Sequence, residues 1–150
     1  MVRPGLALYG GNPTPYDTNP VESVISLDLS ILQIRHVKKG ESIGYGASHY
    51  FEKDTRTATI ALGYADGFLR SASNHAYVFY KGTKCPVIGR VSMDLVTIDV
   101  GHIPNIQPGE TVELLGPHQT IDDLAGYAGT IGYEILTSLG LGQRYKRCYV

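Results

Sequence analysis

Short apolar segments separated by glycine- and proline-containing turns dominate the first three quarters of this chain. Residues 24–37 are rich in β-branched side chains, and apolar and polar residues alternate along 27–31, which is the period of a half-buried strand. After Ile31 the apolar positions shift to Leu32 and Ile34. A β-bulge or a strong twist at this point would account for the shift. The pattern predicts a mainly β fold.

The last quarter of the chain has a different pattern. Thr120 followed by Asp123 is a capping-box pair and predicts a helix start, and a second short helix is predicted over 130–139. Many short strands followed by two small helices favour a barrel-like or rolled sheet. The other predicted strands cover residues 4–9, 57–62, 76–80, 85–100 with a break at 89–90, 111–115 and 144–150.

Composition excludes several classes of function. A length of 150 residues fits one ordinary domain, and a net charge of −1 argues against nucleic-acid binding. The two cysteines, Cys85 and Cys148, form no CxxC pair, so we predict no metal site and no disulfide scaffold. There is neither a signal-like start nor an apolar run approaching the ~20 residues of a membrane span, and we therefore expect a cytoplasmic protein.

Tyr45 is the candidate reactive residue, because it stands between two glycines after a strand-like run. A phenol is a weak acid with an ordinary pKa of about 10. Flanking glycines allow a sharp backbone turn and the close approach of another molecule. Tyr45 can therefore be presented to a group outside its own strand.

Four motifs, taken in their order and spacing, resemble alanine racemase, a fold-type III enzyme that uses pyridoxal 5'-phosphate. The resemblance covers nearly all of the chain. It implies that residues 1–13 are the last strand of an N-terminal α/β barrel and that residues 14–150 are a C-terminal β domain. The four motifs are Arg3–Gly10, Gly44–Ser48, Gly63–Gly67 and Arg90–Asp94.

The resemblance implies a cofactor site at the start of the chain. Arg3 would face the pyridine nitrogen, and arginine is always charged and cannot accept a proton. Arg3 therefore disfavours protonation of the pyridine nitrogen, and the carbanion at the substrate's α-carbon is less delocalised and shorter-lived. Such a carbanion is reprotonated before side reactions occur, which suits a racemase. The backbone amides of Gly5 and Leu6 would hold the cofactor phosphate, and Tyr133 would hydrogen-bond it.

By the same resemblance, Tyr45 exchanges the α-proton on the L-alanine side of the substrate, and a lysine works from the opposite face. Racemisation needs two groups because the proton leaves one face and returns to the other. In the family that lysine lies upstream of the region that this chain resembles. Lys38 and Lys39 stand in a charged turn and are interpreted as solvated surface.

Further family residues line the substrate's position and its entrance. The Met93 amide would bind the substrate carboxylate, Asp94 would order the site, and Tyr64 would contact the substrate. Ser92 stands where several family members carry cysteine. The entrance residues implied by the resemblance are Arg70, Arg90 and Ile131.

The family forms head-to-tail homodimers, which implies a site shared between two subunits. An exposed, partly apolar surface containing tyrosines is then expected. D-alanine as the product implies that the enzyme supplies a precursor for cell-wall synthesis. The 150 residues alone are expected to have no racemase activity. On this plan Tyr45, Tyr64, Met93 and Asp94 serve the partner's site, whereas Arg3, Gly5, Leu6 and Tyr133 serve their own.

Three alternatives stay open. A racemase of broader specificity, or one for serine, would use the same motifs. A fold-type III decarboxylase shares the two-domain plan, but Arg3 and Tyr45 argue against it. A non-catalytic β module that mediates association is the third alternative.

Overall fold

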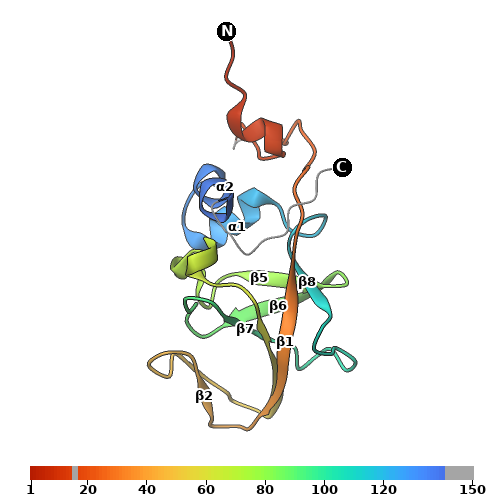
Figure 1. Cartoon of the computed structure of the whole chain (residues 1–150), viewed down its shortest axis with the longest axis vertical. Helices are drawn as coiled ribbons and strands as arrows, with labels where there is room; N and C mark the ends of the chain where they lie inside the picture. The colour runs from red at the N-terminus through yellow and green to blue at the C-terminus, as the bar shows by residue number, and fades with distance from the viewer. Residues whose placement is uncertain (15–16, 141–150) are drawn as a thin grey trace.

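The computed structural model describes residues 1–14 and 17–140. In Figure 1 the strands occupy the lower part of the molecule, and the helices and the N-terminal segment occupy the upper part. The strands are β1 (Leu27–Val37), β2 (Ser42–Ile43), β3 (His49–Tyr50), β4 (Thr55–Ile60), β5 (Tyr77–Tyr80), β6 (Thr83–Ile88), β7 (Val96–Asp99) and β8 (Thr111–Leu115). The helices are the 3-10 helices η1 (Gly5–Tyr9), η2 (Tyr64–Asp66) and η3 (Arg70–Ala72), and the α-helices α1 (Ile121–Ala128) and α2 (Gly132–Gly140).

Six strands close a barrel in the order β1-β4-β7-β6-β5-β8, and neighbouring strands are antiparallel. β1 pairs with β8 along its first part and with β4 along its second part. Its register shifts between Ile31 and Gln33, so the bulge predicted after Ile31 is confirmed. The predicted mainly β, barrel-like fold with two late helices is confirmed as well.

Side chains that alternate along the strands fill the barrel. In β5 and β7 every second residue is buried, as a half-exposed strand requires. Val78, Ile98 and Cys85 are completely inaccessible to solvent. Burial raises the pKa of the Cys85 thiol to about 11, which fits its interpretation as an inert spectator. Cys148 lies outside the described residues.

The two helices follow β8, and the first begins where the sequence indicates. Asp123 N–H donates to Thr120 Oγ1 at 3.1 Å, and Thr120 N–H donates to Asp123 Oδ2 at 2.9 Å, which confirms the capping box. α2 lies against the turn after η2: a Cβ added to Gly67 would stand 2.1 Å from the Ser138 carbonyl oxygen. No helix in the described ranges is long and apolar enough to cross a membrane.

The run Pro4–Tyr9, predicted to be a strand, forms the 3-10 helix η1 instead. Gly5 and Gly10 explain the difference, because their φ angles of +51° and +85° are left-handed and an extended strand has negative φ. The Gly10 amide donates to the Ala7 carbonyl at 3.2 Å and ends the helix. The strand predicted at 144–150 lies outside the described residues, and the domain boundary after residue 13 stays a prediction.

Candidate functional site

Tyr45 lies in the loop of a small two-stranded arm, formed by β2 and β3, that was not predicted as strands (Figure 1). The loop turns tightly because Gly44, Gly46 and Ala47 have φ angles of +81°, +70° and +49°. The Ala47 amide donates to the Gly44 carbonyl at 3.1 Å. Tyr45 is 69% exposed, so its phenol is available to a second molecule and is not buried in the sheet.

The Tyr45 loop rests on the segment that follows β6. The Arg90 amide donates to Ser48 Oγ at 3.0 Å. A Cβ added to Gly44 would stand 2.6 Å from that Oγ and 2.9 Å from the Arg90 nitrogen, so the contact requires glycine. A Cβ added to Gly46 would stand 3.7 Å from a guanidinium nitrogen of Arg90. The structure therefore brings the loop that carries Tyr45 against Arg90.

The predicted substrate-binding residues lie on two segments whose backbones touch. The Tyr64 amide donates to the Ser92 carbonyl at 3.0 Å. A Cβ added to Gly63 would stand only 2.0 Å from the Met93 carbonyl oxygen. Tyr64 and Met93 are 46% and 53% exposed, and Asp94 is exposed too. Tyr64 and Met93 are thus held together on the surface.

Two supporting residues of this contact were missed by the sequence analysis. Ser92 Oγ donates to the Leu95 carbonyl at 2.7 Å and accepts from the Leu95 amide at 3.0 Å, which closes the turn that carries Met93. Asp66 is buried, and its Oδ2 accepts from the Gly63 amide at 2.9 Å. An Asp-Gly pair is typical of a turn, so Asp66-Gly67 carries a local signal, whereas nothing local signals the role of Ser92.

The three residues predicted to hold a phosphate also meet, although they are far apart in the chain. The Leu6 amide donates to the Tyr133 hydroxyl at 3.2 Å. A Cβ added to Gly5 would stand 2.6 Å from that hydroxyl oxygen. Gly5, Leu6 and Tyr133, which we call the cradle, present a backbone amide and a hydroxyl at one place. Arg3 is exposed two residues before it.

The predicted entrance residues come from three elements and are all exposed. Arg70 lies on η3, Arg90 follows β6, and Ile131, 64% exposed, immediately precedes α2. Within residues 1–14 and 17–140, no hydrogen bond joins the cradle to the Tyr45 loop. Two concave sites of about 230 and 330 Å³ lie elsewhere, and neither contains a predicted site residue.

The barrel topology explains why Tyr64, Arg70, Arg90 and Met93 share one end of the barrel. Ile60 at the end of β4 pairs with Val96 at the start of β7, and Ile88 at the end of β6 pairs with Thr97. The β4–β5 and β6–β7 connections therefore emerge at the same end of the barrel. The first carries Tyr64 and Arg70, and the second carries Arg90 and Met93.

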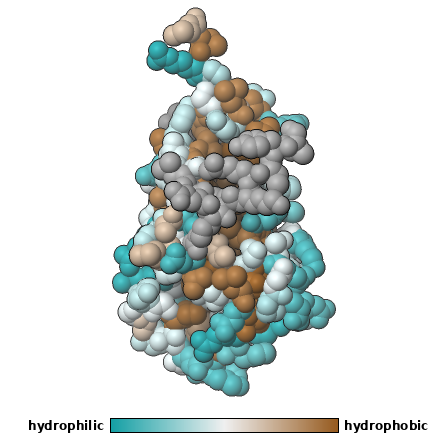
Figure 2. Space-filling model, viewed as in Figure 1, coloured by the Kyte–Doolittle hydropathy of each residue, from teal (hydrophilic) through white to brown (hydrophobic). Residues whose placement is uncertain are grey.

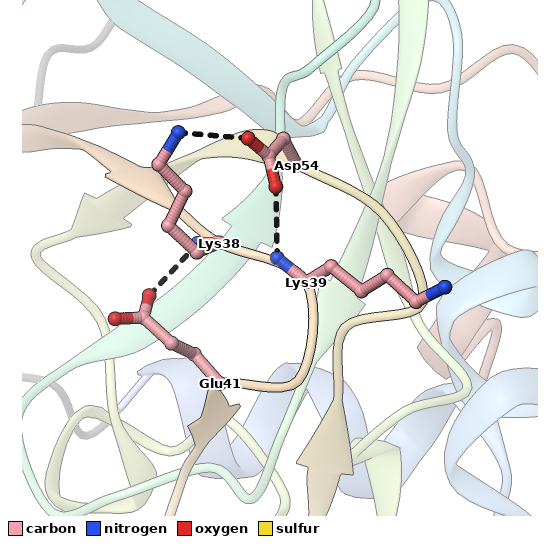
Figure 3. A network of polar contacts seen from close by, with 4 residues as sticks. All are labelled: Lys38, Lys39, Glu41 and Asp54. Carbon is pink, nitrogen blue, oxygen red and sulfur yellow. Dashed lines mark hydrogen bonds and ion pairs between the residues drawn. The ribbon is translucent and has the colours of Figure 1, made fainter.

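The turn that begins the Tyr45 arm is fixed by charged groups (Figure 3). Lys38 Nζ donates to Asp54 Oδ2 at 2.8 Å, the Lys39 amide donates to Asp54 Oδ1 at 2.9 Å, and the Lys38 amide donates to Glu41 Oε2 at 2.9 Å. The hydrogen bond and the charge of Asp54 raise the pKa of Lys38. Its side chain is 75% exposed, which confirms the surface interpretation.

Many large apolar or aromatic side chains reach the surface, and several of them are tyrosines. Figure 2 shows apolar residues lying between polar ones on the face in view. Exposed residues of this kind are Leu8, Tyr9, Tyr45, Tyr50, Tyr64, Met93, Leu95, Ile131 and Tyr133.

Comparisons with known proteins agree on one family. The family model described as alanine racemase, C-terminal domain, matches residues 24–149. The catabolic alanine racemase of Rhizobium johnstonii is 50% identical over 151 residues, which cover 99% of this chain and 40% of that protein. The alanine racemase of Acidiphilium cryptum is 52% identical over 147 residues, which cover 98% of this chain and 41% of that protein.

Solved structures give the same answer for the fold. The alanine racemase of Bartonella henselae with covalently bound pyridoxal phosphate superposes with a TM-score of 0.91 and 39% identity, covering 97% of this chain and 40% of that one. The Streptomyces coelicolor enzyme gives a TM-score of 0.91 at 36% identity, covering 99% of this chain and 40% of that one. The chain thus spans about 40% of the length of its curated relatives. It belongs to the alanine racemase C-terminal domain family.

Proposed function

We propose that this chain is the C-terminal part of an alanine racemase, an isomerase that uses pyridoxal 5'-phosphate and interconverts L-alanine and D-alanine. The observation that carries the proposal is the exposed phenol of Tyr45 on a tight, glycine-rich loop. Family membership supports it. The remainder of the full-length protein would supply the α/β barrel and the lysine for the opposite face of the substrate.

The cradle suits the phosphate of the cofactor. Gly5 leaves no room for a Cβ, and an amide and a hydroxyl converge beside it. In our proposal the Leu6 N–H, which donates to the Tyr133 hydroxyl in this structure, would turn to a phosphate oxygen when the cofactor binds. The Tyr133 O–H would donate to the phosphate as well, and Arg3 would face the pyridine nitrogen. When bound, the pyridoxal group withdraws electrons from the substrate and makes its α-proton acidic.

The Tyr45 phenolate would take the α-proton from L-alanine, and the phenol so formed would return it in the reverse direction. The Met93 amide would bind the substrate carboxylate, Asp94 would order the site, and Tyr64 would contact the substrate. The guanidinium groups of Arg70 and Arg90 would attract an anionic carboxylate to the entrance, which Ile131 narrows.

We further propose that the site is shared in a head-to-tail homodimer. In Figure 1 η1, which carries Gly5 and Leu6, lies near the top of the molecule, whereas the arm that contains β2 lies at the bottom. This separation of the cradle from the Tyr45 loop supports the arrangement. Tyr45, Tyr64, Met93 and Asp94 would serve the partner, and the isolated chain would be inactive. The product would be cytoplasmic D-alanine for cell-wall synthesis.

Replacing Tyr45 with phenylalanine in the full-length protein tests the proposal. Tyr45→Phe should abolish the turnover of L-alanine, whereas D-alanine should still exchange its α-proton with D₂O through the lysine on the other face. Tyr50→Phe is a matched control, because Tyr50 belongs to the same arm and is 64% exposed. L-Alanine turnover by Tyr45→Phe at the rate of the parent protein would refute the proposal. Serine and other amino acids, assayed beside alanine, measure specificity.

A further inference from the structure

The segment after β6 leaves the barrel sheet at Gly89, so its backbone N–H groups need partners outside the strand ladder. Three successive amides find side-chain oxygens from other segments. They are Gly89 N–H to Asn74 Oδ1 at 2.7 Å, Arg90 N–H to Ser48 Oγ at 3.0 Å and Val91 N–H to Ser73 Oγ at 2.9 Å. We call this set of three bonds the amide clasp.

The clasp has a rigid base. Val91 is 1% exposed and Gly89 is also buried, so the segment is anchored in the core. Asn74 has a left-handed φ of +61°, which costs energy for most residues and is tolerated by asparagine. That conformation and the bond from the Gly89 amide occur at the same residue.

Each partner of the clasp belongs to a segment that carries a candidate functional residue. Ser48 ends the loop of Tyr45, and its Oγ is the atom nearest to a Cβ added at Gly44. Ser73 Oγ also donates to the Arg70 carbonyl at 2.6 Å. The clasped segment itself carries Arg90 and leads on to Met93.

We propose that Ser48, Ser73 and Asn74 are positioning residues, which hold the Tyr45 loop and the Arg70 turn in fixed register on the segment that leads to Met93. The Tyr45 loop and the Arg70 turn, which are distant in sequence, are thereby both attached to residues 89–91. The proposal deepens the function proposed above and rests on the role of Tyr45 in it.

Ser48→Ala in the full-length, cofactor-loaded protein is the main test. A misplacement of about 1 Å can cost on the order of 100-fold in rate, and we expect a roughly tenfold or greater fall in kcat for L-alanine. Ser48→Thr keeps the hydroxyl and should restore most of the rate. Ser42→Ala is the control, because Ser42 lies exposed in the same arm and its side chain makes no recorded hydrogen bond in the described residues.

The isotope effect on the α-proton separates positioning from general loosening. Tyr45 removes this proton only from L-alanine, so misplacing Tyr45 should raise the effect of α-deuteration with L-alanine but not with D-alanine. A slower Ser48→Ala enzyme whose isotope effects match those of the parent in both directions would overturn the proposal.

Amide hydrogen exchange tests the clasp without any turnover. Asn74→Gly keeps the left-handed backbone but removes the acceptor, whereas Asn74→Asp keeps an acceptor. Exchange at Gly89 should accelerate in Asn74→Gly and stay slow in Asn74→Asp, and Ser73→Ala should accelerate Val91. Equal exchange in all three variants and the parent would contradict the clasp.

Tyr45→Phe, measured in parallel, tells the two hypotheses apart. If Tyr45→Phe is inactive while Ser48→Ala has the rate and isotope effects of the parent, the positioning proposal fails and the function proposal stands. If Tyr45→Phe keeps full turnover of L-alanine, the proposed function fails, and with it the role assigned to the clasp.

Discussion

Replacing Gly5 with alanine should weaken the binding of the cofactor. The new Cβ would stand 2.6 Å from the Tyr133 hydroxyl oxygen and 3.2 Å from its Cε1, so the ring must move. The hydroxyl then leaves the position from which it would donate to the phosphate, and the loss of that hydrogen bond costs about 1 kcal/mol. The left-handed φ of +51° adds about 1–2 kcal/mol for a residue with a Cβ.

Together these terms come to about 2–3 kcal/mol, which corresponds to a roughly 30- to 150-fold higher Kd for pyridoxal 5'-phosphate if they act on the bound geometry. Absorbance titration of the cofactor-free, full-length protein measures this Kd. Gly109→Ala is the control, because Gly109 also has a left-handed φ, +90°, but a Cβ there would meet no atom within 4 Å. It should lower stability and leave the Kd unchanged.

A double-mutant cycle with Tyr133→Phe sharpens the test. Without the hydroxyl, the nearest ring atom to the new Cβ is Cε1 at 3.2 Å, so Gly5→Ala should cost less in the Tyr133→Phe background than in the parent. Strict additivity of the two substitutions, or a parental Kd for Gly5→Ala, would show that the cradle does not bind the phosphate.

Three further predictions concern the domain itself. Thr120→Ala should remove the hydroxyl oxygen that accepts from Asp123 N–H at the start of α1. The free energy of unfolding should fall by about 1 kcal/mol, which calorimetry would show as a fall in Tm of about 2–4 °C. In a Cys148→Ser variant, Cys85, with a thiol pKa of about 11 and no exposed surface, should react with a thiol reagent at pH 8 only after denaturant is added, and prompt reaction of the folded variant would contradict its burial. The Lys38 ammonium and the Lys39 amide hold the pKa of Asp54 below its ordinary value of 3.8, so the stabilisation is complete above that value and is lost as the pH falls through the folded-state pKa. In a plot of the urea midpoint of unfolding against pH, the parent protein should therefore lose stability at acid pH more steeply than Asp54→Asn.

Features encoded within a few residues were predictable from sequence. The bulge after Ile31 follows from the phase shift of the apolar positions, and the start of α1 follows from Thr120 and Asp123. The turn at Tyr45 follows from its flanking glycines. Each of these depends on local backbone preferences that the residues themselves carry.

Features that depend on distant contacts were not predictable. η1 was expected to be a strand, yet Gly5 is left-handed and lies against Tyr133, which is 127 residues from Leu6 along the chain. β2 and β3 have two residues each, too few to show a period of two. Ser48 and Asn74 are ordinary loop residues in sequence, because only tertiary folding brings the Gly89 and Arg90 amides to them.

The Tyr45 arm leaves the barrel at one end, but its loop contacts a segment that emerges at the other end. The arm therefore needs a contact far from the point where it leaves β1. The arm leaves β1 at Val37, whose partner in β4 is Thr55, so it starts at the end of the barrel opposite to Ile60 and the β4–β5 connection. To reach Arg90 it must fold back along the barrel, and a small separate core of Val37, Phe51 and Ile88 lies beneath it. Apolar contacts are not directional and set only where the arm lies. The bond from the Arg90 amide to Ser48 adds direction, so the orientation of the phenol depends on it.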